Sequence, residues 1–125
     1  MSKTIYRYTR TIIETSHDLM QPDLEHVSPS QRQVIDLIDR YTLQLIQAYN
    51  QGNLIPVAQH QHYFRHVLID ILTPIVGYTE MLADGWLGQL HTEHEDAIGR
   101  LLYQVRGLMN YIIDEDYTTS LEESA

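Results

Sequence analysis

The chain has 125 residues, of which 43% are hydrophobic and 20% are charged, a composition typical of one folded globular domain. Seventeen acidic residues against eight basic ones give a formal net charge of -9, which disfavours nucleic acids and anionic membrane surfaces as partners. The sequence contains no cysteine, and this excludes disulfides, thiolate catalysis and cysteine-ligated metal sites.

The N-terminal 27 residues have a helical pattern of apolar side chains at Ile5, Tyr8, Ile12 and Leu19, followed by an expected loop at Gln21-Pro22-Asp23. The start of the chain lacks the apolar stretch of a signal peptide. No apolar run approaches the roughly 18 to 20 residues of a membrane span. We therefore expect a cytoplasmic protein.

A second helix is predicted from Pro29 to about Asn50. Ser28 supplies the N-cap, Pro29 the first helical position and Gln31 the returning side chain of a capping box. Apolar residues then recur at alternating intervals of four and three, at Val34, Ile38, Tyr41, Leu45 and Ala48. This spacing places one apolar stripe along one face of the helix.

The third helix is predicted to be the longest. Asn53 can cap it, Pro56 is tolerated in its first turn, and it ends around Asp84-Gly85. Its stripe consists of Phe64, Ile71 and Tyr78 at heptad position d and Leu68, Ile75 and Leu82 at position a. This assignment puts His66 at position f, which points away from the neighbouring helices.

The fourth helix is predicted to begin with a capping box from Thr92 to Glu95, and its apolar stripe is Ile98, Leu101, Val105, Leu108 and Ile112. The acidic tail after residue 113 is expected to fray. We find no strand pattern, so the sequence predicts an all-α protein. Two antiparallel helices cannot bury wide apolar faces by themselves. The cover must come from residues 29–50, from a second copy of the chain, or from both.

The hairpin from near Tyr63 to Tyr117 resembles the dimerisation and histidine-phosphotransfer domain of sensor histidine kinases. The first helix of that domain usually reads H-E-L-R-T-P-L-x-x-I-x-G-Y-x-E-L-L, and its end is present here as Gly77-Tyr78-Thr79-Glu80-Met81-Leu82. The stretch "GWLGQLHTEHEDAIGRLLYQVRGLMNYI" is similar to the loop and second helix of the family. The resemblance implies a helical hairpin that forms a homodimeric four-helix bundle, with residues 53–125 as the hairpin with its acidic tail and residues 1–52 as an additional N-terminal helical region.

Two alignments to the family motif compete. Without a gap, the phosphoacceptor position falls on His66, and the acid, threonine and proline of the motif correspond to Val67, Asp70 and Ile71. Matching Thr73-Pro74 to the Thr-Pro of the motif requires a deletion of three residues and puts Ile69 at the phosphoacceptor position. We prefer the ungapped alignment because it keeps a histidine there, and because a deletion inside a packed helix disturbs every later contact.

A neutral imidazole is a nucleophile towards phosphoryl groups, and in the family the adjacent acid orients it and accepts its proton. Val67 cannot do this. The resemblance implies that residue 70 would position water for hydrolysis of the phospho-aspartate of a partner, but the charge of Asp70 is unfavourable beside an incoming phosphoryl group. The chain has no room for an ATP-binding domain and no glycine-rich nucleotide motif. We therefore expect no autonomous kinase activity and no cofactor.

We expect a stand-alone histidine kinase-like dimerisation or adaptor module in two-component signal transduction, acting through protein contacts. Its expected partners are a second copy of the chain and a response regulator receiver or a histidine kinase. The residues expected to contact the partner are Ile69, Asp70, Thr73 and Val76. An alternative is a histidine phosphotransferase that relays phosphate through His66 to or from a receiver aspartate.

A further alternative is a metal-binding or structural helical bundle. It rests on His60, His62 and His66, with His91 and His94, because histidines one helical turn apart can share a metal. The sequence has no strict ligand motif such as H-E-x-x-H. We therefore expect no metal.

Overall fold

The computed structural model describes residues 3–20, 27–52 and 57–124, with side chains described within 4–20, 27–51 and 65–114. These residues form four helices, α1 (Lys3–Met20), α2 (Pro29–Gly52), α3 (Val57–Ala83) and α4 (Thr92–Ser124), and no strand. The predicted all-α class is confirmed. The expected loop at residues 21–23, the cap at Asn53 and Pro56 lie outside the described residues.

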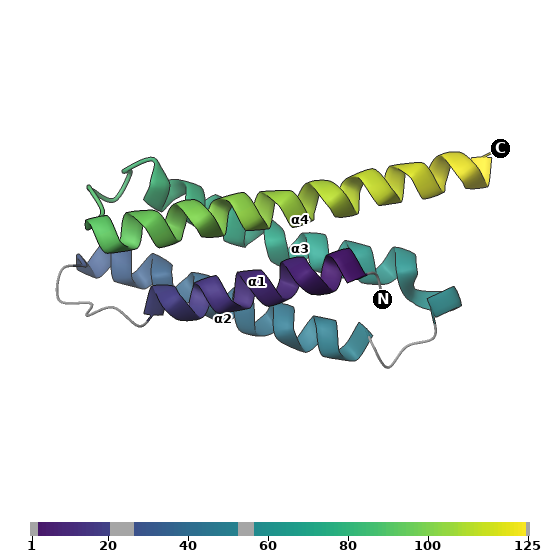
Figure 1. The fold of residues 1–125 in the computed structure, drawn as a ribbon, viewed down its shortest axis with the longest axis horizontal. Coiled ribbons are helices and arrows are strands. Elements are labelled where there is room, and N and C mark those ends of the chain that lie inside the picture. Colours follow the sequence, from purple (N-terminus) through teal and green to yellow (C-terminus); the bar gives the residue numbers. More distant parts are fainter. Residues whose placement is uncertain (1–2, 21–26, 53–56, 125) are drawn as a thin grey trace.

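The four helices lie side by side, and helices that follow one another along the chain run in opposite directions (Figure 1). Helix α1 packs against α2 and α4, and α3 packs against the same two helices. All four contribute to a single hydrophobic core, in which Ile12, Ile38, Ile75 and Leu108 have no exposed surface. Each helix therefore has two neighbours and one outward face.

The apolar faces of α3 and α4 are covered within one chain. Leu68 and Leu72 of α3 and Leu101 and Val105 of α4 are fully buried, and they share their core with residues of α1 and α2. The sequence left open whether residues 29–50 or a second copy of the chain cover these faces. In the structure, the chain's own helices α1 and α2 cover them. A second copy is not needed to bury these side chains, and the homodimer stays a prediction.

The predicted capping box at the start of α2 is confirmed. The Ser28 amide donates to Gln31 Oε1 at 3.1 Å, and the Gln31 amide donates to Ser28 Oγ at 3.1 Å. Gln31 Nε2 also donates to the carbonyls of Gly88 and Gln89, each at 3.3 Å. Gln31 is 4% exposed, so this side chain joins the first turn of α2 to the loop between α3 and α4.

Replacing Gln31 with alanine is expected to lower the free energy of unfolding by about 1 to 2 kcal/mol, because it removes half of the capping box and the two hydrogen bonds to the carbonyls of Gly88 and Gln89. Urea denaturation measures this loss. Gln33→Ala, at an exposed position two residues later, is the matched control and should change stability by under about 0.5 kcal/mol. Equal losses in both variants would contradict a role for the Gln31 contacts.

The predicted capping box at the start of α4 was wrong by one residue. The amides of His94 and Glu95 both donate to the His91 carbonyl at 2.9 Å, and the Glu93 amide makes a long contact of 3.5 Å with His91 Nδ1. The helix therefore begins at Thr92 with His91 as its N-cap. The ring nitrogen of His91 takes the place that the sequence assigned to the Thr92 hydroxyl.

The predicted stripe of α3 was partly wrong. Its buried residues are Arg65, Leu68, Leu72, Ile75, Thr79 and Leu82. Ile71 and Tyr78 are only half-buried, and the Tyr78 ring stacks on Tyr41 of α2 with centroids 6.1 Å apart. Because α3 packs between two helices, its buried arc is centred between them, and the Ile71 and Tyr78 side lies at the edge facing α2. The Phe64 side chain lies outside the described residues.

Two further segments differ from the sequence-based expectation. Helix α4 continues to Ser124 instead of fraying after residue 113, and residues 108–124 contain no glycine or proline that would end it.

By length and composition, residues Arg65–Ala83 of α3 also qualify as a membrane-spanning candidate, the single such helix found in the described part of the chain. The expectation that no run approaches this length therefore fails for α3. This segment also buries Leu68 and Leu72 in the hydrophobic core.

Candidate functional site on the outer face of α3

The outer face of α3 consists of His66, Asp70, Thr73 and Gly77, which are all exposed. These residues are spaced three or four positions apart, so their side chains follow one another along one side of the helix. With Leu72 and Thr79 in the core, the heptad position of His66 changes from f to b. His66 is nevertheless exposed, as the ungapped alignment requires of a phosphoacceptor.

The structure separates the four residues expected to contact a partner into two groups. Asp70 and Thr73 are exposed, whereas Ile69 and Val76 are half-buried and pack against the hydrophobic core. The expected apolar patch beside His66 is therefore largely part of the protein interior. Only the exposed parts of Ile69 and Val76 remain at the surface, beside the outer face.

Thr73 and Pro74 give this face a local hydrogen-bonding pattern. Thr73 Oγ1 donates to the Ile69 carbonyl at 2.7 Å, so its proton is used within the helix while its lone pairs face outward. Pro74 lies inside α3 and has no amide proton. The carbonyl of Asp70 therefore receives no intrahelical bond from residue 74. This carbonyl is an additional acceptor on the side of the helix that carries His66.

The chemistry available to His66 depends on the acid one turn away. Val67 is half-buried and packs against the core, so the residue directly after His66 provides no base. Asp70 follows His66 by four residues on the same exposed face. A carboxylate at this spacing is within reach of the imidazole and can accept a proton from it.

Glu80, the charged residue of the Gly-Tyr-x-Glu motif, has a partner that sequence reasoning missed. Arg106 Nη2 of α4 lies 2.6 Å from Glu80 Oε1, and the two side chains remain 53% and 40% exposed. An ion pair this exposed contributes at most about 1 kcal/mol, but it links the two helices of the hairpin. The sequence shows only that the two residues have opposite charges. Whether they pair depends on how α3 and α4 align, which the sequence does not give directly.

The histidines proposed as metal ligands do not form a site in the described part of the chain. No group of three or more histidine, aspartate or glutamate side chains that could hold a metal ion is found there. His94 is fully buried, and its ring lies 6.3 Å from the exposed His91 ring, centroid to centroid. His60 and His62 lie outside the residues with described side chains.

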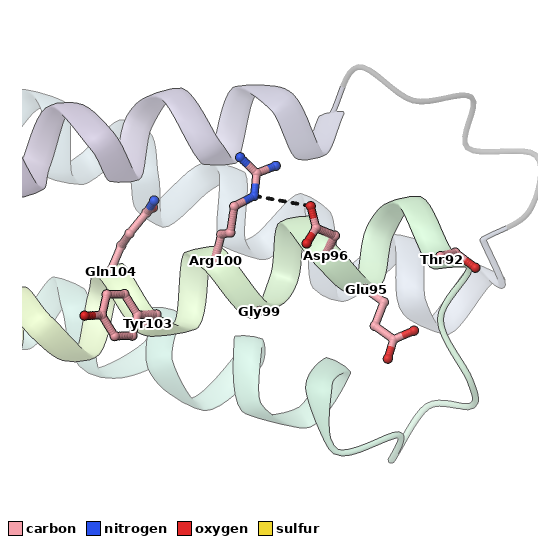
Figure 2. A pocket seen from close by; sticks show the side chains of 7 residues that line it. All are labelled: Thr92, Glu95, Asp96, Gly99, Arg100, Tyr103 and Gln104. Carbon is pink, nitrogen blue, oxygen red and sulfur yellow. Dashed lines mark ion pairs between the residues drawn. The ribbon is translucent and has the colours of Figure 1, made fainter.

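A shallow groove of about 540 Å³ lies on α4 and was not anticipated from the sequence. Figure 2 shows its lining, which comes from α4 alone: Thr92, Glu95, Asp96, Gly99, Arg100, Tyr103 and Gln104. Gly99 leaves the space open, since no atom lies within 4 Å of where its Cβ would be. Arg100 is held by Asp96 at 3.6 Å.

This groove is a weaker candidate than the outer face of α3, because side chains from one helix cannot enclose a ligand. The groove begins at the loop between α3 and α4 and extends along α4 to Gln104, whereas His66 lies on α3, almost five helical turns before Ala83, or about 25 Å along the helix.

No family model matches the chain, and no curated protein or solved structure matches it either. The resemblance to histidine kinase domains therefore rests on the sequence motifs alone and stays a prediction.

Proposed function

We propose that this protein is a stand-alone histidine kinase-like adaptor module of cytoplasmic two-component signal transduction, which acts through protein contacts. The observation that supports this most directly is the outer face of α3. His66, Asp70 and Thr73 are exposed along one side of a helical hairpin whose other side is buried by α1 and α2. In this proposal the four helices form a bundle that holds the outer face rigid for a receiver or kinase partner.

Binding to the outer face is tested by introducing a large, charged side chain at Thr73. We expect Thr73→Arg to weaken binding of a receiver or kinase by at least about tenfold, since a long cation in the centre of an interface both clashes and must be desolvated. Affinity is measured against a panel of purified receivers and kinases. Gln47→Arg, which adds the same charge at an exposed position of α2, is the control. Equal affinities for both variants would exclude this face as the binding surface.

The dimer part of the proposal is tested by the mass in solution. Homodimerisation predicts twice the chain mass of 14.6 kDa. Because α1 and α2 already cover the hairpin, two copies must pair either by exchanging these helices or through outward faces. A mass of 14.6 kDa would refute the dimer and leave the outer face of α3 as the surface for other proteins.

The second candidate function is phosphate relay through His66, and the exposed acid at Asp70 favours it. Incubation with a phosphorylated receiver should then give acid-labile label on the protein, which His66→Ala abolishes and His17→Ala, at an exposed histidine of α1, leaves unchanged. Asp70→Asn should slow labelling by about 100-fold if Asp70 accepts the imidazole proton. Partner binding without any label would support the adaptor function and exclude the relay.

A further inference from the structure

The outer face of α4 points away from α1 and α3, the two helices against which α4 packs. Its residues recur at alternating intervals of four and three, and all of them are exposed: Thr92, Asp96, Gly99, Tyr103, Arg106 and Asn110. This spacing forms a straight stripe about 27 Å long on one side of the helix. A stripe of this kind is the pattern by which two helices pair lengthwise.

The centre of this face combines a projecting side chain with an open space. The Tyr103 side chain is 80% exposed, the highest value among the exposed large apolar side chains of the described residues. One turn before it, no atom lies within 4 Å of where a Gly99 Cβ would be. Both residues line the groove of about 540 Å³ on α4 (Figure 2). Tyrosine is enriched where proteins bind one another, and the complement of a projecting ring is a space such as the one above Gly99.

The face also carries charges of both signs at separate places, with Asp96 towards its start and Arg106 towards its end. Each has a partner in its own chain, since Asp96 lies 3.6 Å from Arg100 and Arg106 lies 2.6 Å from Glu80. The side chains of Asp96 and Arg106 are nevertheless 80% and 53% exposed. Each can therefore contact a second charge of the opposite sign.

We propose that the outer face of α4 binds the same face of a second copy of the chain, with the two α4 helices antiparallel. The face is symmetric about the level of Leu101, because Gly99 and Tyr103 lie two residues from it and Asp96 and Arg106 lie five. A two-fold axis at this level puts the Tyr103 ring of each copy over Gly99 of the other. It also puts Asp96 of each copy beside Arg106 of the other. This inference rests on the homodimer in the proposed function and assigns the faces that pair.

The arrangement favours a second copy over a different occupant of the groove. The groove has walls from one helix only, and a second α4 supplies the opposite wall. The match of ring with space and of acid with base then occurs twice, because symmetry repeats every contact. The next register along the face is less favourable, since it would place the Asp96 carboxylate opposite the apolar Ile113. Unlike an exchange of helices, this pairing leaves α1 and α2 in the core of their own chain.

The space above Gly99 is tested by filling it. Gly99→Gln adds a long side chain at an exposed position where no other atom obstructs it, and replacing glycine inside a helix favours helix formation. The variant should therefore keep the natural Tm. We expect its dimer dissociation constant, measured by sedimentation equilibrium at roughly 0.15 M salt to screen the net charge, to rise at least about tenfold.

Gly77→Gln is the matched control for this variant. It introduces the same side chain at an exposed glycine of α3, where no atom lies within 4 Å of the Cβ position either. Because Gly77 lies on the outer face of α3, the substitution should leave the dimer dissociation constant unchanged.

A disulfide between the two copies tests the register. The natural chain has no cysteine, and the proposed pairing puts Thr92 of one copy opposite Asn110 of the other. The double variant Thr92→Cys/Asn110→Cys should therefore form a covalent dimer under mild oxidation. The two positions lie about 27 Å apart along one helix, so no disulfide can form between them within one chain. For the same reason, Thr92→Cys alone and Asn110→Cys alone should stay unlinked.

The outcomes separate this inference from the dimer on which it rests. A natural chain of 14.6 kDa in solution would overturn both. A dimer that Gly99→Gln leaves intact, a dimer that Gly77→Gln weakens equally, or a double cysteine variant that stays unlinked would overturn the pairing through α4 and leave the dimer in place.

Discussion

Replacing Leu72 with alanine is expected to lower the free energy of unfolding by about 3 kcal/mol, whereas Ile71→Ala should lower it by only about 1 kcal/mol. Leu72 has no exposed surface, so its truncation leaves a cavity inside the core. Ile71 is half-buried, and water can occupy most of the space that its truncation opens.

This pair of variants distinguishes the two heptad assignments of α3. The stripe predicted from the sequence includes Ile71 and does not include Leu72, whereas the structure buries Leu72 fully and Ile71 only in part. Urea denaturation followed by circular dichroism gives both free energies under one set of conditions. A larger loss for Ile71→Ala than for Leu72→Ala would show that α3 is rotated relative to the arrangement described above.

Replacing Pro74 with alanine is expected to raise the free energy of unfolding by about 1 to 3 kcal/mol. The proline ring clashes with the preceding turn and deprives the Asp70 carbonyl of its helical hydrogen bond, which together cost about 3 kcal/mol in a helix interior. The gain is smaller than this full cost because the half-buried ring also makes contacts that alanine loses.

Thermal unfolding measures the effect as a rise in Tm of about 5 to 10 °C for a chain of this size. Thr73→Ala is the neighbouring control, because it removes the exposed hydroxyl bonded to the Ile69 carbonyl but leaves Pro74 in place, and it should change Tm little. A fall in Tm for Pro74→Ala would mean that packing of the ring outweighs the lost hydrogen bond.

The parts of the fold that local sequence determines could be predicted. The start of α2 is set by Ser28 and Gln31, because the side chain of each accepts a hydrogen bond from the amide of the other, and the structure has these bonds. The start of α4 was misplaced because His91 and Thr92 both can cap a helix, and the local sequence does not decide between them. The rotation of α3 was misplaced for a different reason, since it depends on two neighbouring helices and not on its own periodicity.

The candidate site likewise has one part that the sequence predicted and another that it did not. Exposure of His66 and Asp70 follows from their spacing within one helix, and it was predicted. The burial of Ile69 and Val76 and the pairing of Glu80 with Arg106 depend on how α4 lies against α3, which the spacing within α3 does not define.

The contact between α1 and α4 joins the two helices that are furthest apart in the sequence, and the start of α1 and the end of α4 lie at the same end of the molecule (Figure 1). A short linker between them would make a circular permutant that opens in the loop after Ala83. In the permutant, α4 and α1 would be consecutive helices, and α3 and α4 would become the two ends of the chain, so the long-range contact would move from the α1–α4 pair to the α3–α4 pair. Since contacts between distant segments slow folding, and each form of the chain closes one such contact between its terminal helices, we expect the permutant and the natural chain to fold at similar rates.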